Sequence, residues 1–253
     1  MDQKTALITG ATSGIGMETA RLLAQNNYNL ILTGRRKDRL DKLKSEIEQT
    51  TPTKILTLNF DIREKAEAER AYFSLPEKWT KIDVLINNAG LAAGLAPVSS
   101  ADICDWEQMI DTNIKGLLYM SRLVTPGMIE RESGHVINIA SIAGKEAYPN
   151  GSVYCGTKHA VMAISRAMRV ELLPSNVKVS TICPGAVETE FSLVRFHGDQ
   201  GKAGKVYKGF TPLSAKDIAE TILFVLSRPP HVNIDDLLIM PTAQGSARDF
   251  YRK

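Results

Sequence analysis

The stretch TALITGATSGIGMETARLLAQ, residues 5–25, decides the fold. It starts with a mostly apolar run, typical of a strand that helices cover on both faces of a parallel sheet. A glycine-rich turn follows, and Ile15–Gln25 then has the apolar spacing of an amphipathic helix. Glycines in such a turn let the backbone bend sharply and approach a pyrophosphate at the helix N-terminus. The expected phosphate-binding residues are Gly10, Thr12, Ser13, Gly14, Ile15 and Gly16.

The spacing of these glycines leaves an alternative open. It is G-x3-G-x-G rather than the common G-x-G-x-x-G, and a lone glycine-rich turn can serve packing alone. The strand before the turn and the helix after it favour nucleotide binding, because that is the context in which such turns hold phosphates.

Strand-like and helical patterns alternate along the rest of the chain. The predicted strands are Thr5–Thr9, Asn29–Thr33, Lys54–Phe60, Val84–Asn87, His135–Ala140, Lys178–Cys183 and Leu237–Met240. The predicted helices are Ile15–Gln25, Asp38–Gln49, Glu64–Phe73, Asp105–Arg122, Ser152–Leu172 and Ala215–Leu226. This alternation predicts one doubly wound α/β domain over residues 1–253, with a mostly parallel sheet and helices on both faces. The segment 186–212 is Gly- and Lys-rich and weakly periodic, so we expect a long loop there, such as a lid.

Composition excludes several classes of protein. The formal net charge of +3 is too small to indicate a nucleic-acid or membrane partner. The three cysteines, Cys104, Cys155 and Cys183, have no paired spacing, which is typical of a reducing compartment. The four histidines do not cluster with other ligands, so we expect no metal site. No apolar run approaches the ~20 residues that span a bilayer, and the N-terminus lacks a signal-peptide core. We therefore expect a cytoplasmic protein.

Two arginines follow the second predicted strand. Dinucleotide-binding units that take NAD place an acidic residue near this point to bond the ribose 2′-hydroxyl. Here the sequence has Arg35 and Arg36, and guanidinium groups suit a 2′-phosphate, so NADP(H) is favoured over NAD(H). The alternative is that the basic run begins a solvated helix face.

Polar residues follow the third and fourth predicted strands, where open α/β sheets bind ligands. Asp61 and Ile62 are expected at the adenine, and Asp61 could cap a helix, either instead or at the same time. Asn88, Ala89 and Gly90 combine an amide with small residues that allow close backbone approach. The alternative for the asparagine is that it only tethers a loop.

Three further features point to catalysis. Asn113 lies inside a predicted helix, where a buried amide needs partners such as a carbonyl freed by a kink, or water. Ser141 follows the fifth strand and can hydrogen-bond a substrate oxygen, or merely form a turn. Tyr154 and Lys158 are four residues apart, so both project from one helix face, and the cation would lower the pKa of the phenol. A surface pair is the alternative for these two residues.

The turn after the sixth strand completes the pattern. Pro-Gly fixes a turn at the carboxyl end of the sheet, where the chain could meet the carboxamide and phosphates of a cofactor, or form a plain loop. The residues expected to bind the cofactor there are Pro184, Gly185, Val187 and Thr189.

In this order, these motifs resemble the short-chain dehydrogenase/reductase family across nearly the whole chain. The resemblance implies a single Rossmann-type domain with a seven-stranded parallel sheet, and hydride transfer between a nicotinamide cofactor and a carbinol or carbonyl. It implies that Tyr154 is the acid/base, that Lys158 lowers its pKa and binds the nicotinamide ribose, that Ser141 polarises the substrate oxygen, and that Asn113 holds a proton-relay water. It also implies a homotetramer.

A narrower resemblance is to the NADP-dependent 3-hydroxy acid dehydrogenases, which include serine 3-dehydrogenase and L-allo-threonine dehydrogenase activities. It is carried by the segments 33–36, 105–113, 190–199 and 231–234 together with Met240-Pro241. Ile142 and the charged segment 145–148 depart from the expected pattern near the substrate. The substrate could therefore differ from that of the group.

The resulting hypothesis is an NADP(H)-dependent dehydrogenase of short 3-hydroxy acids or β-hydroxy amino acids. A substrate carboxylate needs donors, and Arg195 is the first candidate by its bidentate geometry, with Lys145 the second. A general NADPH-dependent reductase of diketones or aldehydes is the alternative enzyme. A catalytically silent dinucleotide sensor is less favoured, because it has no chemical need for Asn113, Ser141, Tyr154 and Lys158 together.

Overall fold

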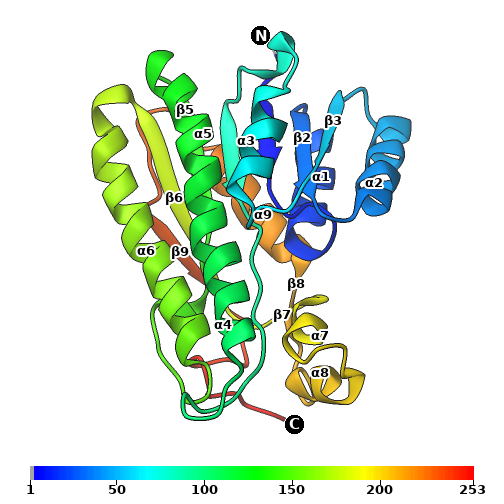
Figure 1. Ribbon diagram of the computed structural model, residues 1–253, viewed down its shortest axis with the longest axis vertical. Helices are drawn as coiled ribbons and strands as arrows, with labels where there is room; N and C mark the ends of the chain where they lie inside the picture. Colours follow the sequence, from blue (N-terminus) through cyan, green and yellow to red (C-terminus); the bar gives the residue numbers. More distant parts are fainter. Residues whose placement is uncertain (1–2) are drawn as a thin grey trace.

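The computed structural model describes residues 3–253, and a sheet of seven parallel strands forms its framework (Figure 1). The strand order is β3-β2-β1-β4-β5-β6-β9. The strands are β1 (Thr5–Ile8), β2 (Asn29–Gly34), β3 (Ile55–Asn59), β4 (Val84–Asn87), β5 (Gly134–Ile139), β6 (Val177–Pro184) and β9 (Asp236–Ile239). Each predicted strand is present with its ends shifted by no more than one residue. The predicted fold class is confirmed.

The strand order reverses beside β1, and this reversal positions the site. From β1 the chain moves outward to β2 and β3, then crosses back so that β4 pairs with the other side of β1. In the register Leu7 lies between Ile31 of β2 and Leu85 of β4. The crossovers before and after the reversal run over opposite faces, so a crevice opens at the carboxyl ends of β1 and β4.

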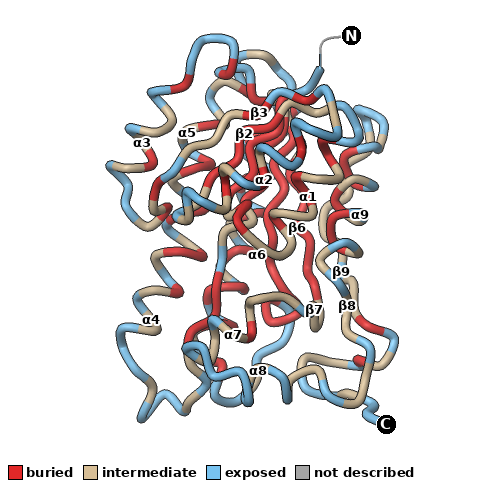
Figure 2. The backbone as a smooth tube through the Cα atoms, turned by 90° about the vertical axis from the view of Figure 1, so that its right-hand side faces the viewer, coloured by how far each residue is buried: buried red, intermediate tan, exposed pale blue. Residues whose placement is uncertain are grey.

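Helices cover both faces of the sheet, and the central strands are buried (Figures 1 and 2). On one face, residues such as Ile8 and Leu32 pack against helices α1, α2 and α9. On the other face, residues such as Leu7 and Ile31 pack against α3, α5 and α6. The helix bounds are α1 (Gly14–Gln25), α2 (Lys37–Thr50), α3 (Lys65–Phe73), α4 (Ile103–Ile110), α5 (Leu117–Glu130), α6 (Ser152–Leu172) and α9 (Ala215–Leu226).

The prediction of one helix over residues 105–122 is wrong in two respects: the helix is interrupted, and it extends further at both ends. A π-helical segment, Asp111–Gly116, separates α4 from α5, and α5 continues through Pro126 to Glu130. Val124 and Met128 are buried on either side of the proline, so packing against the sheet sustains the helix beyond it.

The segment 186–212 is more regular than the predicted loop. It contains β7 (Val187–Glu188), α7 (Phe191–Arg195) and α8 (Gln200–Val206), and β7 pairs in parallel with β8 (Leu213–Ser214). Because α8 has no buried residue, its sequence carries no apolar stripe from which a helix could be predicted. Figure 1 shows α7 and α8 beyond the strand ends, at the end of the molecule far from the N-terminus.

The C-terminal residues after β9 lie against this segment. Gln244 is 6% exposed, and its Oε1 accepts from the backbone N–H of Ala186 at 2.8 Å. Lys253 donates its backbone N–H to Gly209 O at 2.8 Å. Residues distant in sequence therefore close the same end of the molecule.

Candidate functional site

A cleft of about 820 Å³ lies at the carboxyl ends of the strands. The turn between β1 and α1, the ends of β2 to β6, the segment 186–212 and the C-terminal residues all line it. All residues predicted to bind the cofactor line this cleft except Gly16. All residues predicted to be catalytic line it except Asn113. Those that do are Gly10, Thr12, Ser13, Gly14, Ile15, Arg35, Arg36, Asp61, Ile62, Asn88, Ala89, Gly90, Ser141, Tyr154, Lys158, Pro184, Gly185, Val187, Thr189 and Arg195.

The turn between β1 and α1 is packed so tightly that glycine is required. Gly10 has a φ of +67°, and a Cβ added there would lie 2.9 Å from the Cα of Ala89. A Cβ on Gly16 would lie 2.5 Å from the backbone oxygen of Gly10. Asn88 donates its side-chain amide to Thr9 O at 2.8 Å and to Gly10 O at 3.1 Å, which ties the turn to β4. The glycines therefore serve packing, and the helix N-terminus that they expose fits a pyrophosphate.

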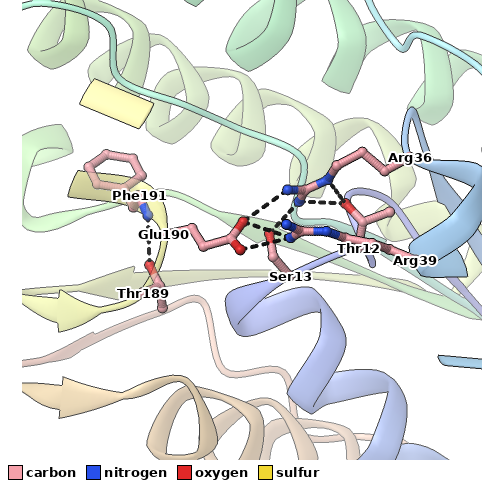
Figure 3. Close-up of polar contacts among 7 residues, drawn as sticks. All are labelled: Thr12, Ser13, Arg36, Arg39, Thr189, Glu190 and Phe191. Carbon is pink, nitrogen blue, oxygen red and sulfur yellow. Dashed lines mark hydrogen bonds and ion pairs between the residues drawn. The ribbon is translucent and has the colours of Figure 1, made fainter. Parts of the chain in front are cut away.

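Arg36 forms the polar edge of this turn (Figure 3). Its Nε and Nη2 donate to Thr12 Oγ1 at 3.1 and 2.8 Å, and Nη2 also donates to Ser13 Oγ at 2.8 Å. Arg35 is about half exposed, with Nη1 3.6 Å from an Asp61 carboxylate oxygen. Two guanidinium groups and two hydroxyls thus meet at the end of β2, a donor set that fits a phosphate.

Asp61 is held by a neighbour and does not cap a helix. Arg63 donates to its carboxylate from its backbone N–H at 3.1 Å and from its side chain at 2.7 Å. The cap of α3 is Glu64, so the alternative role of Asp61 as a helix cap is wrong. Partial burial alone would raise the pKa of Asp61, but the bonds and charge of Arg63 outweigh it and lower that pKa.

Tyr154 and Lys158 lie on the first two turns of α6, and both side chains are buried. Burial raises the pKa of Tyr154, and the charge of Arg195 opposes this only in part. Lys158 donates its Nζ to Ile139 O at 2.8 Å, and burial lowers its pKa to about 8. The net pKa of Tyr154 is therefore raised in this geometry, and the role expected of Lys158 in lowering it stays a prediction.

The π-helical segment directs Asn113 toward the same place. Asn113 accepts from the backbone N–H of Leu91 and donates to Leu91 O, both at 2.8 Å, and it also donates to Thr157 Oγ1 at 3.0 Å. A Cβ on Gly90 would lie 3.2 Å from Asn113 Oδ1 and 3.4 Å from Lys158 Nζ. Asn113 and Lys158 therefore converge over Gly90, and the amide of Asn113 has already used both N–H donors.

Ser141 lies at the end of β5, as predicted. Its hydroxyl accepts from the backbone N–H of Ala143 at 3.1 Å and is 3.4 Å from Pro184 O. The serine therefore forms the turn that was its alternative role, while its hydroxyl still lines the cleft beside Tyr154.

Arg195 extends from α7 over Tyr154, one of the residues predicted to be catalytic. Its guanidinium carbon lies 5.0 Å from the ring centre of Tyr154 and 5.5 Å from that of Phe191, and Nη2 donates to Tyr148 Oη at 2.8 Å. Its Nε is buried without a hydrogen-bond partner among residues 3–253. Lys145 does not line the cleft and pairs with Asp236 at 2.7 Å.

Several site residues were missed from the sequence. They are Tyr148, Glu190, Phe191, Gln244 and Arg248, all of which line the cleft. The segments 145–148 and 190–199 stood out in the sequence, but no spacing rule connects them with the C-terminal residues. Only the folded chain brings these parts together.

The comparisons with known proteins agree with this geometry. Residues 4–198 match the family described as short chain dehydrogenase. A relative from Salmonella typhi, an NADP-dependent 3-hydroxy acid dehydrogenase, is 48% identical over 242 residues, covering 95% of this chain and 96% of that protein. One from Schizosaccharomyces pombe with the same description is 44% identical, covering 100% of this chain and 98% of that protein.

Solved structures give the same result. The chain resembles a closed form of serine dehydrogenase complexed with NADP+, with a TM-score of 0.91 and 45% identity over 98% of this chain and all of that one. It also resembles the serine dehydrogenase of Escherichia coli, with a TM-score of 0.81 and 40% identity over 95% of this chain and 99% of that one. The match over residues 4–198 and these relatives show that the chain belongs to the short-chain dehydrogenase family.

Proposed function

We propose that this protein is an NADP(H)-dependent dehydrogenase of short 3-hydroxy acids or β-hydroxy amino acids. The observation that carries the proposal is that one cleft is lined both by Ser141, Tyr154 and Lys158 and by Arg36 with its partners Thr12 and Ser13. The names of the relatives from Salmonella typhi and Schizosaccharomyces pombe support the same activity.

The cofactor preference is argued from the end of β2. The Thr12 and Ser13 hydroxyls accept hydrogen bonds from Arg36, so their own O–H groups remain available to donate to an anion. Arg35 adds a second, half-exposed guanidinium. A 2′-phosphate is the part of NADP(H) that this donor set distinguishes, since NAD(H) offers only a hydroxyl there.

The residues near Tyr154 would move the proton. Bound NADP(H) would supply or accept the hydride. On oxidation Tyr154, in its phenolate form, would take the proton of the carbinol O–H as the hydride leaves. On reduction the neutral phenol would give that proton to the carbonyl oxygen, while Ser141 holds that oxygen. Lys158, with its pKa of about 8, is mostly charged at neutral pH and would stabilise the phenolate or bind the ribose.

Asn113 would act mainly by fixing the cleft floor. Its side chain holds the backbone of Leu91 and the hydroxyl of Thr157, one residue before Lys158. A relay water would therefore have to bond the second lone pair of Asn113 Oδ1 or a backbone carbonyl.

The segment 186–212 would serve as the lid, with Arg195 meeting the substrate carboxylate. The guanidinium lies beside Tyr154 and keeps one buried N–H without a partner within residues 3–253, as expected of a group that receives an anion. Lys145 is less suited because Asp236 already neutralises it.

We also propose a cytoplasmic homotetramer. In the part of the chain that the structure describes, the three thiols are free and no helix is long and apolar enough to cross a membrane. Exposed apolar side chains on α5 and α6 support a contact between copies, namely Leu118, Ile129 and Val170. Light scattering after size exclusion should give four copies, and a monomer would contradict this.

Initial rates test the proposed activity. NADP+ reduction should proceed with L-serine, L-allo-threonine or 3-hydroxybutyrate, and NAD+ should be at least about tenfold less effective in kcat/KM because it lacks the 2′-phosphate. No rate on all three, with rapid oxidation of NADPH by a diketone or an aldehyde, would shift the function to carbonyl reduction.

A further inference from the structure

Glu190 connects the start of α7 with the arginines after β2 (Figure 3). One oxygen accepts from Arg36 Nη1 at 2.9 Å, and the two oxygens accept from Arg39 Nη1 at 2.7 and 2.9 Å. Partial burial alone would raise the pKa of Glu190, but the two guanidiniums outweigh it and lower that pKa. Glu190 is therefore ionised at neutral pH and paired on two sides.

Arg36 is shared between Glu190 and the turn after β1. Its Nη1 holds the carboxylate, while Nε and Nη2 hold Thr12 and Ser13. The hydroxyl protons of Thr12 and Ser13 are free to meet an anion from the other side of this guanidinium. An anion bound there would leave the contact between Arg36 and Glu190 intact.

The local charges favour keeping the contact between Glu190 and the arginines when a phosphate binds. Arg35, Arg36, Arg39 and Arg63 carry four positive charges against two negative charges on Asp61 and Glu190. A phosphate of nearly two negative charges brings this group close to neutrality with Glu190 still in place. Without the phosphate an excess of positive charge remains, and the arginines repel one another.

We propose that Glu190 is a positioning residue that couples the lid to the cofactor 2′-phosphate through Arg36. The phosphate fixes Arg36, Arg36 fixes Glu190, and Glu190 holds α7, which carries Arg195 over the substrate site. The proposal rests on the proposed function, since it requires that NADP(H) binds here. It makes NADP(H) a better stabiliser of the lid than NAD(H), beyond any difference in binding.

Trypsin cleavage of the lid tests this coupling without relying on activity. Lys202, Lys205 and Lys208 are exposed on and after α8 and report its opening. With both cofactors saturating, as set by calorimetry, NADP+ should slow cleavage at least about fivefold more than NAD+ in the unmodified protein.

Glu190→Gln keeps the side-chain size and removes the charge. NADP+ and NAD+ should then slow trypsin cleavage equally, so the ratio of the two protections should fall to about one. Arg39→Gln should lower this ratio of protections only partially, because the contact between Arg36 and Glu190 remains. Glu188→Gln is the matched control, since Glu188 is exposed on the same segment and has no ion pair among the described residues; it should keep the original ratio.

A second readout separates positioning from binding. With NADP+, Glu190→Gln should raise substrate KM about fivefold and leave kcat within about twofold, because Tyr154 is untouched. An unchanged cleavage ratio in Glu190→Gln, or equal protection by two cofactors of unequal affinity in the unmodified protein, would overturn the coupling alone. Equal affinities for NADP+ and NAD+ would overturn the proposed cofactor, and the coupling with it.

Discussion

The turn between β1 and α1 and the segment 186–212 face each other across one cleft but are held in different ways. The turn is fixed by backbone contacts that leave no room for a Cβ at Gly16. The segment has backbone bonds of its own, such as that from Gly94 N–H to Arg195 O, but side chains hold it to the other side of the site, among them Glu190 on Arg36 and Arg195 on Tyr148. Close backbone packing makes one side of the site rigid, whereas a few polar contacts allow the other side to move.

This difference agrees with the division of tasks in the proposed function. Phosphate recognition needs fixed N–H groups and a constant helix end. Substrate entry and product release need a part that opens, and exposed side-chain ion pairs contribute only about 0–1 kcal/mol each. A lid held by such pairs can open without disturbing the sheet.

Of three changes that test this contrast, the largest effect is expected when one methyl group is added to the turn. Gly16→Ala places a Cβ 2.5 Å from Gly10 O, so the turn must shift and NADPH should bind at least about 100-fold more weakly. Gly204→Ala is the matched change in α8, where no atom lies within 4 Å of the added Cβ. It should leave binding unchanged and stabilise the helix by up to about 1 kcal/mol. Calorimetric titration with NADPH measures the affinity of both variants. Equal losses of affinity in Gly16→Ala and Gly204→Ala would contradict the contrast between the two regions.

The second largest effect is expected from a fall in pH, which should destabilise the sheet through His135. His135 is buried in β5 with Nε2 2.9 Å from Ser180 Oγ, and burial lowers its pKa from 6.5 to about 3. Between these values the unfolded chain binds the proton and the folded chain does not, so stability is lost as pH falls below 6.5.

Urea unfolding checks this pH dependence. From pH 7 to pH 5 the protein should lose about 2 kcal/mol through His135, a loss that His135→Gln should not show. If both proteins lose the same free energy of unfolding over this range, the histidine is not the cause.

The smallest of the three effects is expected at the lid. Arg195→Lys keeps the charge beside Tyr154 but loses the bidentate geometry, so KM for a hydroxy acid should rise about tenfold with kcat little changed. Steady-state kinetics measure it, with Lys205→Gln on α8 as the control that should leave KM unchanged. An unaltered KM in Arg195→Lys would show that the carboxylate is held elsewhere.

The same contrast explains what could be predicted from the sequence. The strands and α1, α6 and α9 were predicted almost to the residue, because buried runs and amphipathic stripes record their packing. Asn113 was expected to need a partner such as a carbonyl freed by a kink, or water. The helix does change to a π-helical segment there, but the partners of Asn113 are Leu91 and Thr157, which the sequence did not indicate. Helices α7 and α8 were missed, since they bury almost nothing that a periodicity could report.

Partnerships across the cleft could not be predicted. Nothing in the sequence links Glu190 with Arg36, or Gln244 with Ala186, because each pair is far apart in the chain and meets only in the fold. The raised pKa of Tyr154 was missed for a similar reason: burial is a property of the whole structure, and it outweighs the nearby cations.

The most direct test of the central claim is the kcat of Tyr154→Phe measured beside its affinity for NADPH. The substitution removes only the hydroxyl that would exchange the proton. We predict that kcat falls by about 10³-fold while the Kd for NADPH stays within about threefold, because the phosphate end of the cleft is untouched. A kcat within about tenfold of the unmodified protein would contradict the role of Tyr154 and with it the proposed mechanism.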